Sequence, residues 1–259
     1  MKTIRIMAAV AASLLLAGAC THEQQMTTEK IEKENEIKLI DNAEDSPSYG
    51  ISYSIEYITG GVKKEVMDKI NSAIAGFIYT EDEKSFTVPE ACEVWESHCI
   101  SEYEADKEGL DEDFDPESAW MYNWSSDISG TFGTRCEARD WQTYVFGGSD
   151  YLGGAHPFSY ASYTVFDMKT GDIVRENDFL DTENEDLWEL LYERVLDGDD
   201  EEALTDEDLF ELPTFNNNFR VDDNGVTWLY NAYEIAAYVY GPIEATLTWE
   251  ELAPYLLKK

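Results

Sequence analysis

The feature that most limits what this chain can fold into is an uncharged run at its N-terminus. Residues 6–19 are rich in alanine and leucine, and Lys2 and Arg5 precede them. Fourteen such residues are too few to span a bilayer, and a short apolar run behind positive charges is typical of a secretion signal. We therefore expect residues 1–19 to be removed on export, so that the folded protein is built from the remaining 240 residues.

Cys20 follows this run directly. The small residues Ala17, Gly18 and Ala19 suit a signal peptidase, and a cysteine just after the cleavage site can carry a diacylglycerol on its thiol. The sequence therefore predicts a lipoprotein of the cell envelope, at the outer membrane or the cell surface in a Gram-negative cell. The alternative is an ordinary signal peptide that leaves a free thiol at Cys20. No other stretch approaches the roughly 20 apolar residues of a membrane helix, so the lipid would be the only anchor.

Acidic residues dominate the charge of the chain. There are 55 Asp and Glu residues against 18 Lys and Arg, a net charge of -37, which becomes -39 once Lys2 and Arg5 are lost. Such a surface repels phosphate backbones, which argues against nucleic acid as a partner. It attracts cationic proteins and divalent cations, although acidity that only maintains solubility is the simpler explanation. An apolar content of 43% is typical of a globular chain with a core.

Three further cysteines, Cys92, Cys99 and Cys136, are candidates for a disulfide because export favours oxidation. Cys92 and Cys99 stand two helical turns apart, about 10 Å along a helix axis, which is too far for a bond within an intact helix. We therefore expect Cys136 to pair with one of them and the third thiol to remain. No C-x-x-C pair indicates zinc.

The first half of the mature chain divides into four segments. Residues 20–45 are polar and charge-mixed, which predicts a flexible acidic tether behind the lipidated cysteine. Residues 49–58 alternate as a half-buried strand does, and residues 62–79 carry apolar side chains at helical spacing. A second helix begins near Pro89 and ends at about Tyr103.

From Trp120 the sequence favours strands. Together the segments predict an α+β fold in which helices are segregated from an antiparallel sheet. The module is expected over residues 46–259, with an N-terminal part at 46–115 and a C-terminal part at 116–259. The elements expected in the second part are strands at 142–146, 160–167 and 245–249, a turn at 167–172, a hairpin over 218–230, and helices at 186–196 and 205–212.

Three segments carry a resemblance to a known family: 151–156, 165–180 and 230–244. In this order and spacing the chain resembles the RsiV-like and PdaC-like extracellular domain family. That family includes the C-terminal domain of the lysozyme-sensing anti-sigma factor RsiV and the non-catalytic domain of the peptidoglycan deacetylase PdaC. The resemblance covers residues 46–257 and implies an exported two-part α+β module. Its RsiV branch implies binding of lysozyme, a strongly cationic protein. Pro157 and Phe158 follow His156 where relatives continue with glycine and a polar residue.

The candidate ligand-binding residues lie in two of these segments. The first set forms a glycine-rich turn whose histidine could bind a ligand or exchange a proton, and tight backbone packing is the alternative. The second set belongs to an aromatic cluster near Trp228. Aromatic faces bind sugars and proteins, and packing in the core is the alternative. The sets are Tyr151, Gly153, Gly154 and His156, and then Tyr233, Glu234, Tyr238 and Tyr240.

No catalytic or metal motif is complete. Asp111, Asp113 and Asp115 have the spacing of a calcium loop, but Pro116 and Tyr122 stand where its glycine and glutamate belong. Residues 197–202 could hold Ca²⁺ loosely, although a polar connection is the simpler interpretation, and no cofactor is expected. The sequence therefore favours a non-enzymatic envelope binding module, for lysozyme or peptidoglycan. The alternatives are a wall-acting hydrolase or deacetylase-like enzyme and a structural envelope lipoprotein.

Overall fold

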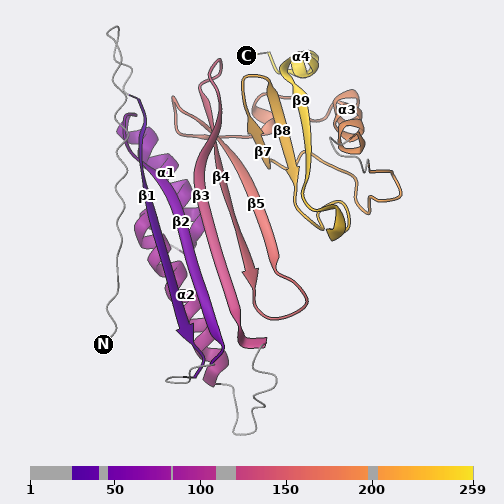
Figure 1. The fold of residues 1–259 in the computed structure, drawn as a ribbon. Coiled ribbons are helices and arrows are strands. Elements are labelled where there is room, and N and C mark those ends of the chain that lie inside the picture. Colours follow the sequence, from indigo (N-terminus) through magenta and orange to yellow (C-terminus); the bar gives the residue numbers. More distant parts are fainter. Residues whose placement is uncertain (1–24, 41–45, 83, 109–120, 198–203, 259) are drawn as a thin grey trace. The chain divides into compact units, whose positions relative to one another are not determined.

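The computed structural model describes residues 25–40, 46–82, 84–108, 121–197 and 204–258. The signal segment and Cys20 lie outside these residues, so the lipid anchor stays a prediction. The fold is α+β. A six-stranded sheet has the order β1-β2-β3-β4-β5-β6, and a three-stranded sheet has the order β7-β8-β9 (Figure 1).

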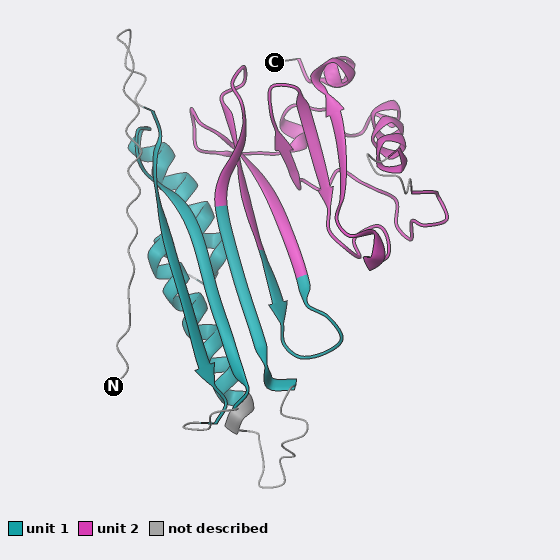
Figure 2. Cartoon of the chain, viewed as in Figure 1, with its two compact units in different colours: residues 1–130, 148–158 teal, residues 131–147, 159–259 magenta. Residues whose placement is uncertain are grey.

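Two compact units divide the chain (Figure 2). Unit 1 comprises residues 1–130 and 148–158, and unit 2 comprises residues 131–147 and 159–259. The predicted division at residues 115 and 116 differs from this one, because strands β3 and β4 each contribute to both units.

Unit 1 is organised by the alternation along β2 (Ser48–Gly60). Its residues Tyr49, Ile51, Tyr53 and Ile55 are all buried, and the residues between them point to the other face of the sheet. Helices α1 (Lys64–Ile78) and α2 (Val88–Glu108) pack on the buried face (Figure 1). The predicted strand and both predicted helices are therefore confirmed.

Residues 27–38, predicted to belong to a flexible tether, instead form strand β1 (Thr27–Lys38). This strand pairs with β2 antiparallel from Lys38 opposite Ser48 to Thr28 opposite Ile58. On its helix-facing side the Lys33 Nζ lies 2.5 Å from the Glu96 Oε2, and the Asn35 Nδ2 donates to the Glu96 Oε1 at 2.9 Å. These partners come from β2 and α2, so the charge-mixed segment itself carried no sign of them.

The six-stranded sheet is mixed rather than purely antiparallel. Strand β2 pairs parallel with β3 (Trp124–Cys136), from Tyr49 opposite Trp124 to Ile55 opposite Gly130. The two helices between these strands bring the chain back to the same end of the sheet, as a parallel pair requires. The remaining strands are β4 (Trp141–Tyr151), β5 (Phe158–Asp167) and the short β6 (Ile173–Val174).

In unit 2, the central strand of the three-stranded sheet is fully buried. Strand β8 (Gly225–Tyr230) is buried at every residue, between β7 (Phe219–Val221) and β9 (Ile243–Thr248). Helix α3 (Glu185–Leu196) begins after the N-cap Asn184. The short helix α4 (Trp249–Leu252) begins with a capping box. The predicted hairpin, last strand and first of the two predicted helices are confirmed.

The second predicted helix of this part, at residues 205–212, is not formed. The Thr205 backbone N–H and side-chain hydroxyl both donate to the Asp208 Oδ2, which closes one turn. Leu209 then makes an antiparallel bridge with Ala236, and the Phe210 N–H donates to the Ile235 carbonyl at 3.1 Å. Pairing with a distant segment therefore replaces the helix that local sequence favoured.

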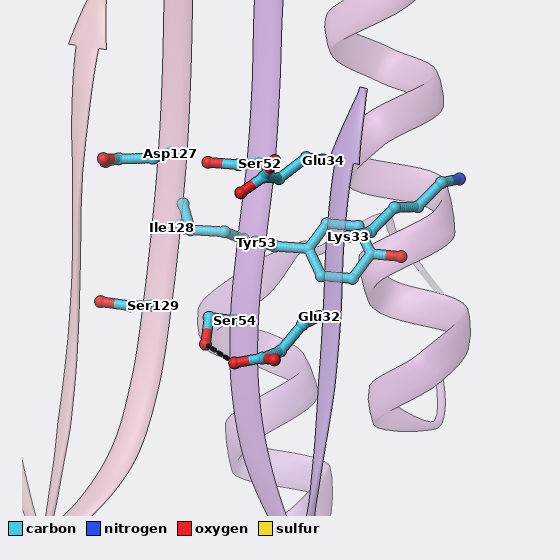
Figure 3. A pocket seen from close by; sticks show the side chains of 9 residues that line it. All are labelled: Glu32, Lys33, Glu34, Ser52, Tyr53, Ser54, Asp127, Ile128 and Ser129. Atoms are coloured by element: carbon cyan, nitrogen blue, oxygen red, sulfur yellow. Dashed lines mark hydrogen bonds between the residues drawn. The ribbon is translucent and has the colours of Figure 1, made fainter. Parts of the chain in front are cut away.

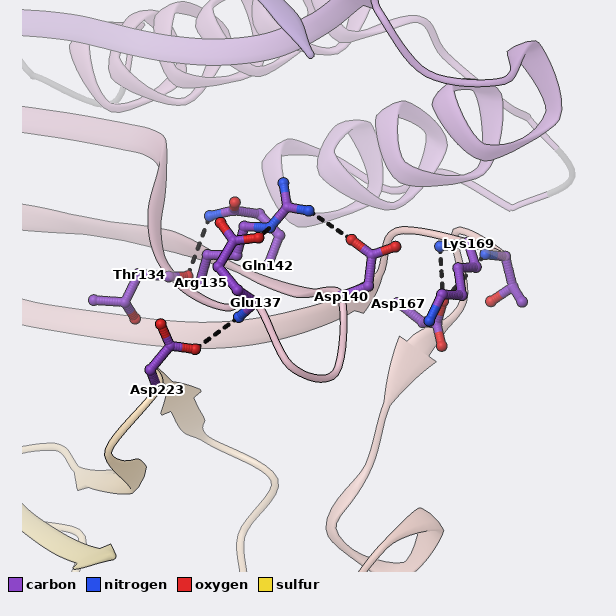
Figure 4. A network of polar contacts seen from close by, with 9 residues as sticks. Thr134, Arg135, Glu137, Asp140, Gln142, Asp167, Lys169 and Asp223 are labelled. Carbon is purple, nitrogen blue, oxygen red and sulfur yellow. Dashed lines mark hydrogen bonds and ion pairs between the residues drawn. The ribbon is translucent and has the colours of Figure 1, made fainter. Parts of the chain in front are cut away.

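Charged groups hold the turn between β3 and β4 (Figure 4). The Arg135 Nη2 lies 2.6 Å from the Asp140 Oδ1, and the Glu137 N–H donates to the Asp223 Oδ1 at 2.8 Å. The neighbouring Arg139 guanidinium lies 4.3 Å from the ring centre of Trp249. These contacts join the turn to the segment that carries β8, β9 and α4.

The predicted disulfide is not formed. Cys92, Cys99 and Cys136 are all free and buried. Cys92 and Cys99 remain two turns apart on the continuous α2, while Cys136 packs with the apolar core of unit 2. Burial raises the pKa of the Cys92 thiol to about 12 and also raises the pKa of the other two thiols.

Two asparagine side chains close an edge of β5 inside unit 2. The Asn231 amide accepts from the Ala161 N–H at 2.8 Å and donates to the Ala161 carbonyl at 3.0 Å. The Asn218 Oδ1 accepts from the Tyr163 N–H at 2.7 Å. Each amide therefore replaces a peptide group of the strand that would otherwise pair there.

We expect a reductant to leave the thermal stability unchanged. Because the three described cysteines form no crosslink, the melting temperature of the chain is expected to be the same with and without dithiothreitol. Differential scanning fluorimetry measures it, and a lower melting temperature under reduction would contradict the free thiols.

Asn231→Ala tests the closure of β5. It leaves the half-buried N–H of Ala161 without its partner, while the Ala161 carbonyl still accepts from the Asn218 Nδ2 at 3.2 Å. The free energy of unfolding is expected to fall by about 1–3 kcal/mol. Urea denaturation measures the change. Asn224→Ala, at an exposed turn, is the matched control and is expected to stay within about 0.5 kcal/mol of the parent. Equal effects of the two substitutions would refute a specific role for Asn231.

Candidate functional site

The glycine-rich turn at residues 151–156 belongs to unit 1. The Tyr151 hydroxyl donates to the Gly154 carbonyl at 3.0 Å, and the His156 Nδ1 lies 2.9 Å from the Pro157 carbonyl. A Cβ on Gly153, which has φ 80°, would stand 2.7 Å from the Met121 carbonyl oxygen. Close backbone packing and positive φ thus account for Gly153. His156 is exposed beside them.

The aromatic cluster of unit 2 separates into core and surface residues. Trp228 and Tyr230 are 0% and 1% exposed, so packing explains them. Tyr233 and Tyr238 are 51% and 40% exposed, and their ring centres lie 5.3 Å apart. Tyr240 is half-buried, and its hydroxyl donates to the Asp208 Oδ1 at 2.5 Å. Two of the predicted tyrosines therefore present their rings to solvent as a pair.

Backbone strain accompanies this exposure. Tyr233 has φ 70°, a left-handed conformation that costs a bulky residue roughly 1–2 kcal/mol. Glu234 enforces the turn, because its carboxylate accepts from the Asn231 N–H and from the Asn216 Nδ2, each at 2.8 Å. Glu234 thus faces the loop that it holds. The predicted ligand residue is a support for the tyrosine beside it.

Further apolar side chains are exposed on the segments that flank the two rings. Val239 is 84% exposed, and Phe210 and Leu212 are exposed on the segment whose backbone bonds to Ile235. Solvent-exposed carboxylates of Asp206, Glu207 and Glu211 lie on that same segment. We name the set of Phe210, Leu212, Tyr233, Tyr238 and Val239 the aromatic patch.

Unit 1 carries a polar groove that the sequence did not indicate. It lies on the face of the sheet that the helices do not cover and has a volume of about 310 Å³ (Figure 3). In Figure 3 the polar side chains of the groove lie in two rows, on either side of Lys33, Tyr53 and Ile128, and each row takes one side chain from each of three neighbouring strands. The Ser54 hydroxyl donates to the Glu32 Oε1 at 3.1 Å. The rows are Glu34, Ser52 and Asp127, and then Glu32, Ser54 and Ser129. The sequence analysis could not predict this groove, because it assigned the β1 residues that line it to a flexible tether.

A buried chain of hydrogen bonds crosses the opposite face of the same sheet. The Tyr49 hydroxyl donates to the Ser126 Oγ at 2.8 Å, and the Ser126 hydroxyl donates to the Asp150 Oδ1 at 2.5 Å. Burial raises the pKa of Tyr49, so the phenol stays protonated and keeps its donor role. These hydrogen bonds satisfy the polar groups within an aromatic core that contains Tyr103 and Trp124.

One carboxylate lies in the core of unit 2. Glu176, 2% exposed, accepts at its Oε1 from the Trp228 Nε1 at 2.7 Å and from the Asn217 N–H at 2.9 Å. Burial raises the pKa of Glu176 to about 6, against these two hydrogen bonds, which lower it. The sequence offered no signal for this residue, since an isolated glutamate before a turn resembles many surface glutamates.

Metal binding finds no support in the described part of the chain, which contains no group of three or more His, Cys, Asp or Glu side chains arranged to hold an ion. All but the first residue of 197–202 lie outside that part, so the loose Ca²⁺ site there stays a prediction. Asp111, Asp113 and Asp115, whose spacing fails as a calcium loop, also lie outside it. Among the same described residues, no helix is long and apolar enough to cross a membrane.

One family model matches part of the second half of the chain. Residues 171–250 match the model of a family described as "Protein of unknown function (DUF3298)". This is the segment with β7, β8, β9 and the aromatic patch. DUF3298 corresponds to the RsiV-like and PdaC-like domain type that the sequence resembled. No curated protein sequence gives a match.

Two solved structures share the fold. A member of the DUF3298 family from Bacteroides fragilis NCTC 9343 has a TM-score of 0.78 at 20% identity, over 91% of this chain and 95% of that chain. A DUF3298 family protein from Pseudomonas aeruginosa PAO1 has a TM-score of 0.57 at 12% identity, over 91% of this chain and 96% of that chain. At these identities the likeness shows the fold alone.

Glu176 is expected to make stability depend on pH. Its folded pKa of about 6 exceeds the ordinary 4.5, so folding favours the protonated form. This contribution is complete below pH 4.5 and is lost as the pH rises through 6, a change of about 2 kcal/mol.

The matched comparison is Glu176→Gln against Glu250→Gln. The amide keeps an oxygen for Trp228 and Asn217 but cannot ionise, so the difference in unfolding free energy between parent and E176Q is expected to grow in favour of E176Q from pH 4.5 to 7. Glu250 is exposed, and E250Q is expected to follow the parent. Parallel profiles for parent and E176Q, measured by urea denaturation, would show that Glu176 does not titrate in this way.

Proposed function

We propose that this chain, with a DUF3298 segment at residues 171–250, is a non-enzymatic binding module of the cell envelope. In this proposal Cys20 carries the lipid anchor, and the aromatic patch binds a cationic protein such as lysozyme. The observation that carries the proposal is the exposed ring pair of Tyr233 and Tyr238, the first of them held in a strained backbone conformation.

The strain supports a role in binding. Left-handed backbone at a bulky residue persists only where the surroundings enforce it, and such residues cluster at ligand sites. Here the Glu234 carboxylate enforces it while the Tyr233 ring stays half exposed. A core role would have buried the ring, as it does for Trp228.

Charge supports a cationic protein as the ligand. Tyrosine rings on a rigid loop are typical anchors of protein interfaces, and charged rims steer the approach of the partner. The exposed carboxylates of Asp206, Glu207 and Glu211 lie on the segment of the patch that carries Phe210 and Leu212. The net charge of -37 acts in the same direction over longer distances.

Tyr233→Gly tests the patch without damaging the fold. Glycine adopts φ 70° without strain, so the free energy of unfolding is expected to stay equal or to rise by up to about 1 kcal/mol. Binding of lysozyme, measured by calorimetric titration, is expected to weaken about tenfold or more, because the anchor ring is gone. Ile173→Ala, an exposed apolar residue on β6, is the control and is expected to bind as the parent does.

The same titration separates the alternatives. If the parent shows no binding to lysozyme but binds soluble peptidoglycan fragments, the ligand of the patch is a wall glycan, since tyrosine faces also stack on sugars. No binding to either ligand would contradict the binding proposal and favour a structural lipoprotein. Digestion of muropeptides by the parent but not by His156→Ala would instead establish the enzyme alternative.

A further inference from the structure

Strand β1 is the outer strand of the six-stranded sheet. It pairs with β2 along one side, and no strand among the described residues pairs with its other side. Its side chains are exposed or half-exposed along the whole length from Thr27 to Lys38. Helices α1 and α2 pack on the sheet mainly through β2. A strand edge of this kind offers a row of backbone N–H and C=O groups to a further strand.

The charge pattern of β1 matches a second copy of β1 that runs in the opposite direction. Residues 29–33 read Glu-Lys-Ile-Glu-Lys, and the same segment read backward has the opposite sign at every charged position. In an antiparallel pair of two β1 strands centred on Ile31, each Glu29 faces a Lys33 and each Lys30 faces a Glu32. The two-fold symmetry makes four pairs of opposite charge around one Ile31–Ile31 contact.

Neighbouring registers lack this match. Centring on Glu32 sets two copies of Glu32 against each other, and centring on Lys33 or Lys30 sets two lysines against each other. In the register centred on Ile31, Thr28 faces Glu34 and Thr27 faces Asn35, so no like charges meet along the strand. Opposite charges across strands stabilise a pair and like charges destabilise it, so one register is selected.

We propose that β1 is a self-recognition edge, at which a second copy of this chain pairs β1 with β1 antiparallel around Ile31. The contact is symmetric, as interfaces of two-fold dimers are, and it keeps the helix-bearing face of both sheets on one side. The occupant is a second copy because the charge order is complementary to itself. The inference goes beyond the proposed function and does not depend on it.

Charge exchange at Lys30 and Glu32 tests the pairing. Both side chains are about half exposed, and they form an ion pair of 2.7 Å within the chain. In a dimer, Lys30→Glu places the new carboxylate opposite Glu32 twice, which is expected to raise the dissociation constant about tenfold or more. The double variant K30E/E32K restores the four pairs between chains and the ion pair between residues 30 and 32. It is expected to recover the parent's dissociation constant.

Sedimentation velocity of the full chain measures the association over a range of concentrations. Lys64→Glu, an equal change of charge at an exposed site on α1, is the control and is expected to leave the dissociation constant within about twofold of the parent. A parent that stays monomeric at every concentration overturns the proposal, as does a K30E variant that associates as the parent does. Failure of the double variant to recover also overturns it.

The register has its own test. Opposite residues in antiparallel strands have Cβ atoms about 4.5–5.5 Å apart, so a cysteine at the symmetry axis can crosslink to its own copy. Under mild oxidation Ile31→Cys is expected to give a covalent dimer, and Glu32→Cys is not. Crosslinking at position 32 and not at 31 overturns the proposed register.

Discussion

The asparagine amides at the edge of β5 are the contacts on which the rest of unit 2 depends. Asn231 exchanges two hydrogen bonds with Ala161, which fixes the point where the chain leaves β8. The next residues then have little freedom, because the Glu234 carboxylate accepts from the Asn231 N–H. Tyr233 lies between these two anchored residues and takes the left-handed conformation that the turn demands. The surface that we assign to binding is thus a consequence of how one strand edge is closed.

A buried carboxylate supports the neighbouring part of the same unit. Glu176 exchanges hydrogen bonds with the backbone and side chain of Asn217 and accepts from the indole of Trp228. The contacts tie the turn after β6 to the segment before β7 and to the buried β8. An ionised carboxylate without such donors would be costly in the core, so the burial of Glu176 depends on these hydrogen bonds. The triplet Asn216, Asn217 and Asn218 therefore organises unit 2 with three different side-chain roles.

Sequence periodicity predicted the elements whose partners did not have to be known. The alternation in β2, the apolar spacing in α1 and the pattern that predicts a helix at residues 186–196 are local, and the structure confirms all three. Elements decided by distant partners were wrong, as with β1, whose Lys33 pairs with Glu96, and with residues 205–212, whose Leu209 bridges Ala236. In the aromatic cluster, sequence could name the tyrosines but could not separate the half-buried Tyr240, which bonds to Asp208, from the exposed Tyr233, since burial depends on how the loop folds.

The parallel pairing of β2 with β3 sets an order of events during folding. Pairing β1 with β2 closes a short loop, because Lys38 and Ser48 are near in sequence. Pairing Tyr49 with Trp124 closes a loop that contains both helices, which costs more chain entropy and slows folding. We therefore expect the hairpin of β1 and β2, with the helices that follow it, to form first, and the rest of the sheet to assemble on it as a template.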